Sequence, residues 1–326
     1  MSIAAKTWVK TVLQSQSSTD TWNEIFKKLQ ELAMTASSPD KLHQETVISD
    51  RLIAESGWNL WADYSKTAPK TAMALSAWWQ NISTEGKAVL ILDGLSIREL
   101  LPLLEGAKNH DVKIPNIRVT GAEVPSDTDF FASALGVSSR SKLSNNHAPS
   151  GFIFSGESTY TDVINVPFED CTDSYARFEN LFLWHTWPDV LIHSPNIHPD
   201  QVHKTTSAEL KSDGFWNFVN RMRQGRRMII TSDHGYAVSR LFSSEEQDPE
   251  AKELLKEFFS ASRYSKAKTT WPGQFMPPLV LTENGYHVVM GQRKWRVPSG
   301  FPQICHGGLS LLEVSVPFIE LPAIQR

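Results

Sequence analysis

The sequence predicts an α/β fold with a mostly parallel sheet, helices on both faces of that sheet, and an additional N-terminal helical region. Two observations support this prediction. From residue 86 onward, short apolar runs closed by polar residues alternate with amphipathic segments, which is typical of strands and helices in a parallel sheet. Before residue 86 the apolar residues recur at helical spacing instead.

The N-terminal region is expected to form a helical subdomain over residues 1–85. Residues 22–32 (WNEIFKKLQEL) place apolar side chains at helical intervals, and Ser18 to Asp20 can cap that helix. Residues 72–82 repeat the pattern. The tryptophans of this region are expected to be packing residues: Trp58, Trp61, Trp78 and Trp79. The sequence therefore predicts two domains, a helical subdomain over 1–85 and an α/β domain over 86–326.

The α/β domain is expected to contain strands and helices in a regular order. Its apolar runs predict strands at 88–94, 116–125, 189–196 and 226–235, with further strands near 284–290 and 314–319. Amphipathic segments predict helices at 97–104, from 126 to 135, and at 208–222. The polar stretch 240–275 is expected to lie beside the functional site as a candidate lid.

Composition and charge exclude several classes of protein. Hydrophobic residues make up 40% and charged residues 21% of the 326 residues, as in ordinary globular proteins. The net charge of −4 gives no broad basic surface for nucleic acid, although a metal-lined site can bind phosphates locally. Two cysteines provide neither a disulfide framework nor a cysteine-type zinc cluster. Without a signal-peptide core or a membrane-length apolar run, we expect a cytoplasmic protein.

The hexapeptide TSDHGY at 231–236 is the most informative motif. An apolar run at 228–230 leads directly into Asp233 and His234, which are an oxygen and a nitrogen ligand at the end of a predicted strand. Gly235 is expected to permit the unusual backbone angles that aim both groups at one point. The motif predicts a divalent metal site. The alternative is a turn in which both side chains only contact solvent.

Similar candidates follow the other predicted strands. Because the carboxyl ends of parallel strands meet at one edge of a sheet, these side chains are expected to converge. Mixed Asp and His ligands suit zinc, or manganese where oxygen dominates, and six or more candidates favour two ions, the arrangement used in phosphoryl transfer. Each candidate also has a structural alternative, such as a turn at Asp93-Gly94 or a packed His193 that at most supports a ligand. The candidates outside the hexapeptide are Asp93, Thr128, His193, His198, Asp200, His203 and His306.

Taken together, these motifs resemble the PglZ-domain family of the alkaline phosphatase superfamily. The most specific segment is 306–319, HGGLSLLEVSVPFI, where the family has a metal-binding His-Gly-Gly followed by Ser-Leu-x-Glu and a strand ending in Pro-Phe. The resemblance covers roughly 86–323 and implies an alkaline phosphatase-like fold. It says little about residues 1–85.

The resemblance implies a role for each matching residue. Asp93, Asp233 and His234 would bind the second metal, Thr128 would be the nucleophile, and His306 would bind the first metal. The superfamily takes its other two first-metal ligands from an Asp followed four residues later by a His. The position that aligns with this Asp is His198, and the sequence departs from the pattern there. The ligands are then His198 and His203, or Asp200 and His203, unless the first site is weakened or empty.

The resemblance implies a metal-dependent phosphohydrolase, foremost a phosphodiesterase acting on nucleotide or nucleic-acid phosphates in a bacterial anti-phage (BREX-like) setting, with other defence-system proteins as partners. Arg98, one short turn past Asp93, is a candidate phosphate clamp, the alternative being an exposed helix arginine. Two other functions stay open. One is a catalytically weakened PglZ module that binds a partner or nucleotide. The other is a small-metabolite phosphomonoesterase, which a deep site closed by 240–275 would favour.

Overall fold

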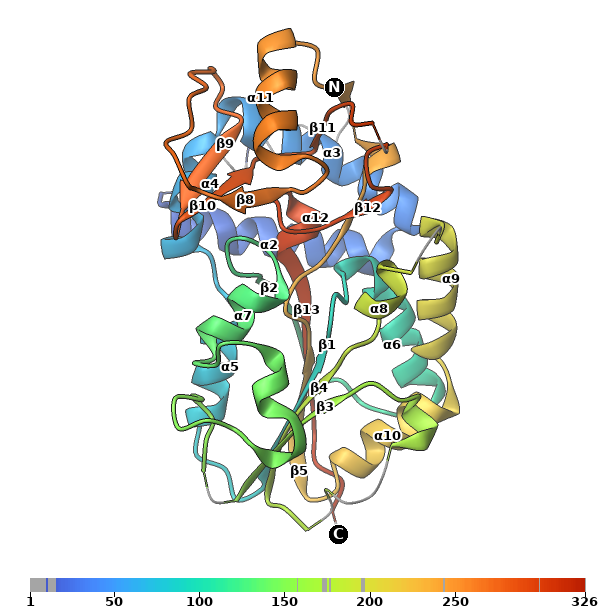
Figure 1. The fold of residues 1–326 in the computed structure, drawn as a ribbon. Helices are drawn as coiled ribbons and strands as arrows, with labels where there is room; N and C mark the ends of the chain where they lie inside the picture. Colours follow the sequence, from blue (N-terminus) through green and yellow to red (C-terminus); the bar gives the residue numbers. More distant parts are fainter. Residues whose placement is uncertain are drawn as a thin grey trace.

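The computed structural model describes residues 10, 16–156, 158–171, 175, 177–194, 197–242, 244–298 and 300–325. A six-stranded sheet in the order β2-β13-β5-β1-β4-β3 forms its centre (Figure 1). Strands β5, β1, β4 and β3 pair in parallel, whereas β13 runs antiparallel to both of its neighbours. The predicted mostly parallel sheet is therefore confirmed. The strands are β1 (Gly86–Leu92), β2 (Asn116–Gly121), β3 (Thr159–Ile164), β4 (Asn180–His185), β5 (Arg226–Thr231) and β13 (Ser315–Leu321).

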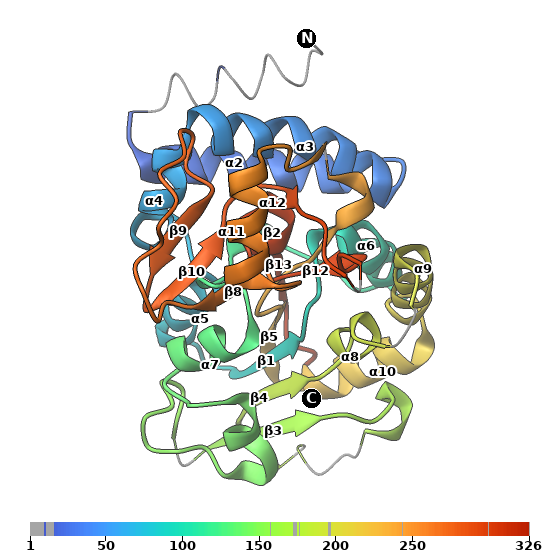
Figure 2. The ribbon, with the colours of Figure 1, turned by 45° about the horizontal axis from the view of Figure 1, so that its top comes forward.

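Helices cover both faces of the sheet because the central strands are apolar on both sides. In β1, Val89 and Ile91 pack against α5 (Thr71–Gln80) and α7 (Thr128–Ala134). Leu90 and Leu92 belong to the cluster on the opposite face, with α6 (Leu100–Asn109) and α10 (Asp213–Met222). Figure 2 shows these two helix pairs on opposite sides of the strands.

The N-terminal helices share the core of the sheet. They are α2 (Ser18–Thr35), α3 (Pro39–Ser56) and α4 (Trp58–Thr67), followed by α5. Trp22 of α2 packs its ring 4.9 Å from those of Trp61 and Tyr64, and all three are fully buried in the same cluster as Leu90 of the sheet. The prediction of helices near 22–32 and 72–82 is confirmed, and Trp61 and Trp78 are buried as expected.

The candidate lid forms a small layer of its own at the end of the molecule where α2 and α3 lie (Figure 1). Helix α11 (Pro249–Phe259) packs beside a three-stranded antiparallel sheet of β8 (Tyr264–Lys266), β10 (Tyr286–Val289) and β9 (Val280–Glu283). Two short ladders pair the segment that enters this layer with the segment that leaves it. They join β6 (Ala237–Val238) to β12 (Ile304–Cys305), and β7 (Ser244–Glu245) to β11 (Arg293–Lys294).

Two sequence predictions are wrong in this part of the chain. Residues predicted as a strand at 189–196 begin with the short helix α8 (Asp189–Ile192), and the strand beside β1 is β4, which ends at His185. The helix predicted at 208–222 is two helices, α9 (Pro199–Glu209) and α10. Ser212 starts α10 by accepting a hydrogen bond from the backbone N–H of Phe215, which interrupts the longer pattern. No helix within the described ranges is both long and apolar enough to cross a membrane.

Candidate metal centre

The side chains that follow β1, β4 and β5 meet at the carboxyl edge of the sheet. Asp93 follows β1, Asp233 and His234 follow β5, and Asp189 begins α8 just beyond β4. Except for Asp189, which is mostly buried, these side chains are fully buried. The loops that follow parallel strands lie at one edge of the sheet, so residues far apart in sequence lie close together there.

Thr128, the first residue of α7, lies at the centre of this group. Its hydroxyl donates to Asp233 Oδ2 at 2.7 Å, and it lies 3.2 Å from Asp93 Oδ1 and 3.4 Å from His234 Nε2. Asp127 caps α7 ahead of it with its side chain. One hydroxyl therefore faces two carboxylates and one imidazole, as the sequence predicted for Asp93, Thr128, Asp233 and His234.

Asp93 is held from its far side. Trp184 Nε1 donates to its Oδ2 at 2.9 Å, and the Arg140 guanidinium pairs with the same oxygen. Burial raises the pKa of Asp93 well above its ordinary value, and the neighbouring Asp233 and Asp189 raise it further. Since Oδ2 is occupied by Trp184 and Arg140, Oδ1 is the oxygen that faces Thr128.

One ring nitrogen of His234 is held by a backbone contact. Its Nδ1 lies 3.0 Å from the carbonyl of Gly235, which can only accept, so Nδ1 carries a proton and Nε2 is the nitrogen that faces Thr128 and Asp93. Burial alone would lower the pKa of His234. The charges of Asp233 and Asp189 outweigh burial and raise that pKa.

A second group of ligand atoms adjoins the first. His193 Nε2 lies 3.3 Å from Asp189 Oδ1 and 3.0 Å from His306 Nε2. Asp189 belongs to two sets whose ligand atoms all lie within 4.8 Å of one another, one with His193 and His306 and one with Asp93 and His234. The His306 and His234 rings stack with centroids 4.3 Å apart, which joins the two sets.

These residues fit a pair of cations. Asp189 Oδ1 is buried and has no hydrogen-bond partner among the described residues, and two imidazole nitrogens face each other across 3.0 Å beside it. A buried acceptor without a donor is costly, and a cation would satisfy it. His306 Nδ1 lies 3.4 Å from Asp127 Oδ2, which leaves its Nε2 directed at His193 and Asp189. Contacts with histidines also lower the pKa of Asp189 despite its burial.

The loop that carries His306 is held by three polar contacts. Ser126 Oγ donates to the carbonyl of Gly308 at 2.7 Å and accepts from the N–H of Gly307 at 3.1 Å. Glu313 Oε1 accepts from the N–H of Gly308 at 3.0 Å, and its carboxylate pairs with the buried Arg263. The segment that carries Thr128 and the loop that carries His306 are thus tied together two residues from Thr128 and His306.

Gly235 has a different role from the predicted one. Its φ is not positive, so it supplies no unusual backbone angle. It permits close approach instead, because a Cβ added there would lie 2.3 Å from the carbonyl oxygen of Leu312. Gly94, next to Asp93, does adopt a positive φ of 71°.

Four other predicted site residues lie elsewhere. His198 caps α9 through its side chain and contacts Asp200 at 3.4 Å, and both side chains are exposed. His203 contacts Glu99 at 3.5 Å, and Arg98 is buried beside His43. The metal-ligand sets found among the described residues contain none of these four. The prediction for His198 and His203 is wrong because His198 begins α9, which follows α8 in the chain and does not reach the strand ends.

Sequence reasoning missed three residues of the site: Asp189, Arg140 and Trp184. A signal for Asp189 was present, because Asp189 and His193 are four residues apart, which is the spacing expected of the first-metal ligands. The apolar residues between them suggested a strand and hid this spacing. Arg140 and Trp184 carried no such signal, since their positions depend on tertiary packing.

A chain of buried hydrogen bonds links the N-terminal helices to Leu311, which follows the loop that carries His306. Arg98 Nη1 lies 3.4 Å from His43 Nδ1, and His43 Nε2 donates to Gln292 Oε1 at 3.0 Å. Gln292 Nε2 then donates to Asp50 Oδ2 at 2.5 Å, and Asp50 Oδ1 accepts from the N–H of Leu311 at 2.7 Å. Burial, with the Arg98 charge, lowers the pKa of His43 to about 3, so the ring is neutral. Its Nδ1 therefore accepts from Arg98 while its Nε2 donates to Gln292.

Comparison with known proteins relates part of the chain to an alkaline phosphatase-like protein. No family model matches the chain. Over 179 residues, 51% of the chain, it is 23% identical to the alkaline phosphatase-like protein BrxZ of Escherichia coli O9:H4 (strain HS), and the match spans 20% of that protein's length.

Two solved structures are more distant. Phosphonoacetate hydrolase from Sinorhizobium meliloti 1021 shares 13% identity over 74% of this chain and 90% of its own, with a TM-score of 0.42. Murine ectonucleotide pyrophosphatase/phosphodiesterase 5 shares 11% identity over 74% and 91%, with a TM-score of 0.41. On the sequence match, the predicted resemblance to the PglZ-type branch of the alkaline phosphatase superfamily is confirmed.

Proposed function

We propose that the chain is a metal-dependent phosphohydrolase that cleaves phosphodiesters of nucleotides or nucleic acids with Thr128 as nucleophile. One observation carries the proposal. The Thr128 hydroxyl lies 2.7 Å from Asp233 and 3.2 Å from Asp93, and the adjoining ligand set contains Asp189, His193 and His306, of which His193 is exposed. A hydroxyl among ligands for two cations is the arrangement that phosphoryl transfer requires.

Each ligand set would hold one ion. Asp189, His193 and His306 would hold the first, and Asp93, Asp189 and His234 the second, to which the family resemblance adds Asp233. The mixture of nitrogen and carboxylate ligands without cysteine suits zinc, and manganese is the alternative. When bound, such ions lower the pKa of a nearby hydroxyl and offset negative charge on phosphoryl oxygens.

The protein's own groups complete the reaction centre. Asp233 Oδ2 accepts the hydrogen bond of the Thr128 hydroxyl, so it orients the attacking oxygen and is placed to take up its proton. Arg140 pairs with Asp93 through Nη1 and is partly exposed, so its remaining N–H groups can bind the non-bridging oxygens of a phosphate. Arg140 takes the role that the sequence suggested for Arg98.

The completeness of the ligand sets favours an enzyme over a weakened binding module. The weakened-module alternative rested on an altered first-metal loop around His198. With Asp189 and His193 in that place, the spacing of four residues is the one the superfamily uses, and no ligand position is left without a residue. The alternative therefore loses its main support.

Similarity to BrxZ supports a bacterial defence setting of the BREX type, with other defence-system proteins as partners and the cytoplasm as the site of action. The chain matches only one fifth of that protein's length, so this setting is part of the proposal.

Turnover of a chromogenic phosphodiester tests the proposal. Thr128→Ala should abolish turnover and leave the metal content of the purified chain unchanged, because Thr128 is not needed to hold either ligand set. Thr128→Ser keeps a hydroxyl and should retain part of the activity, which separates loss of the nucleophile from a packing defect. Unchanged turnover in Thr128→Ala would remove Thr128 from the mechanism.

A further inference from the structure

Two residues that the sequence suggested for the site, Arg98 and His203, line a pocket outside the metal centre. This pocket, of about 390 Å³, lies between the turn that joins α2 to α3 and the helices α6 and α9. Its lining includes Arg98, His203 and Lys204. The proposed reaction uses none of these three residues, so the pocket needs an explanation of its own.

Arg98 lines this pocket and is almost fully buried. Its side chain is only 2% exposed, and its Nε has no hydrogen-bond partner among the described residues. Its nearest carboxylate is Asp40 at 3.8 Å, and Asp40 already pairs with Arg240 at 3.1 Å. A buried guanidinium with an unsatisfied N–H is costly, and an anionic ligand would satisfy it.

Further positive charge surrounds the opening. Lys204 is exposed and forms no ion pair within the part of the chain that the structure describes, while Lys211 pairs with Glu105. The lining thus carries three cationic side chains and one carboxylate. Ser37 and Ser38 also line the pocket, so the N-terminus of the 18-residue helix α3 adds the positive end of its dipole.

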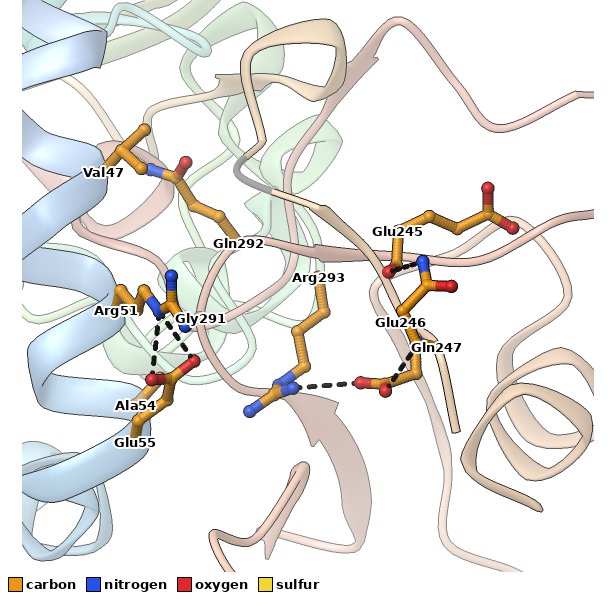
Figure 3. Close-up of a pocket in the computed structure, with 10 residues that line it drawn as sticks. All are labelled: Val47, Arg51, Ala54, Glu55, Glu245, Glu246, Gln247, Gly291, Gln292 and Arg293. Atoms are coloured by element: carbon orange, nitrogen blue, oxygen red, sulfur yellow. Dashed lines mark hydrogen bonds and ion pairs between the residues drawn. The ribbon is translucent and has the colours of Figure 1, made fainter. Parts of the chain in front are cut away.

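A comparison within the molecule shows that this charge is unusual. Another pocket, of about 180 Å³, lies between α3 and residues 245–247 (Figure 3). Its two arginines already face carboxylates: Arg51 contacts both oxygens of Glu55 at 3.0 Å, and Arg293 contacts Glu246 at 3.0 Å. Arg293 Nε, like Arg98 Nε, has no hydrogen-bond partner among the described residues, so the two pockets differ in Lys204, a lining cation that forms no ion pair within the described ranges.

Part of the lining of the pocket at Arg98 is apolar. The apolar residues are Ala33, Ala36, Leu42, Leu101 and Pro102. We propose that this pocket binds a phosphate monoester that carries a small apolar or ring-shaped body, with the phosphate toward Arg98 and Lys204 and the body against Leu42 and Leu101. The proposal does not depend on the chemistry at Thr128, because it concerns a separate set of residues.

Calorimetric titration of the full chain with inorganic phosphate and with phenyl phosphate tests this inference. A chelator is present, because without bound ions the carboxylates of the metal centre repel phosphate. Inorganic phosphate should bind at one site per chain. Phenyl phosphate should bind more tightly, since its ring covers the apolar wall.

Matched double variants separate the pocket from general surface charge. Lys204→Gln with Lys211→Gln should weaken phosphate binding roughly tenfold, because the anion loses Lys204 as a charged donor and the lining loses a second positive charge. Lys108→Gln with Lys113→Gln changes the net charge equally at exposed positions outside the lining and should leave the affinity unchanged.

Three results would overturn the inference: no binding of either compound, equal affinities in the two double variants, or equal affinities for the two compounds. Because binding is measured without turnover, failure here leaves the proposed phosphohydrolase untouched. Failure of the Thr128→Ala experiment likewise leaves this pocket untouched.

Discussion

Replacement of Asp189 by Asn decides between the two possible sets of first-metal ligands. Asp189 offers a buried oxygen without a hydrogen-bond partner, 3.3 Å from His193 Nε2, and it belongs to both ligand sets. Asparagine keeps the size of the side chain but removes the charge. His203→Ala is the matched control, because the sequence suggested His203 as a ligand and the structure places it against Glu99 and Ser207.

The expected magnitude follows from linkage between metal binding and folding. Loss of groups that merely support a ligand weakens metal binding by 10–100-fold, so loss of a ligand itself should cost about 100-fold or more. At a free metal concentration of about 100 times Kd, bound metal stabilises the fold by about 2.7 kcal/mol. After a 100-fold loss of affinity, the same concentration gives only about 0.4 kcal/mol.

Urea denaturation with and without zinc measures this difference. Zinc should raise the free energy of unfolding of the unmodified chain and of His203→Ala by similar amounts, and should raise that of Asp189→Asn by only a fraction. The reasoning is refuted if Asp189→Asn keeps the full zinc effect while His203→Ala loses it, because the first-metal ligands would then lie on α9.

Three further outcomes are expected. Arg140→Gln should lower kcat/KM for a phosphodiester by roughly 10–100-fold at saturating metal, since the transition state loses a charged donor, and unchanged kinetics would exclude Arg140 from phosphate binding. Gly235→Ala should reduce the free energy of unfolding, measured in urea, by about 1–3 kcal/mol or more, because the new methyl group meets the carbonyl of Leu312. Burial raises the pKa of Asp50 from 3.8 to about 7, so the folded state binds more protons than the unfolded state, and the contribution of Asp50 to stability should decline as pH rises from about 4 to 7. Denaturation across this range should show that decline in the unmodified chain and not in Asp50→Asn, and identical pH profiles would contradict the assignment.

The parts of the candidate site that the sequence predicted are those where a strand leads straight into a candidate ligand. β1 ends before Asp93 and β5 before Asp233 and His234, so an apolar run followed by polar residues predicted their places at the strand ends. Thr128 and His306 were found through the family motifs. In each case the information lies within a few neighbouring residues.

The parts that could not be predicted depend on longer-range packing. The strand β4 (NLFLWH) and the helix α8 (DVLI) are both short and apolar, and periodicity does not distinguish a four-residue helix from a strand. Choosing α8 as the strand moved the predicted ligands from Asp189 and His193 to His198 and His203. Arg140 reaches Asp93 from a loop 47 residues away, and only the folded chain reveals that contact.

The buried chain from Arg98 through His43, Gln292 and Asp50 to Leu311 has a consequence for how this protein can be divided. The predicted boundary at residue 85 lies between Asp50 and Leu311, whose backbone N–H donates a hydrogen bond to Asp50. A fragment starting at residue 86 would leave that N–H unsatisfied and expose the apolar surface that Trp22 and Trp61 cover. Residues 16–85 therefore act as part of the scaffold for the loop that carries His306, and the two regions are expected to fold as one unit.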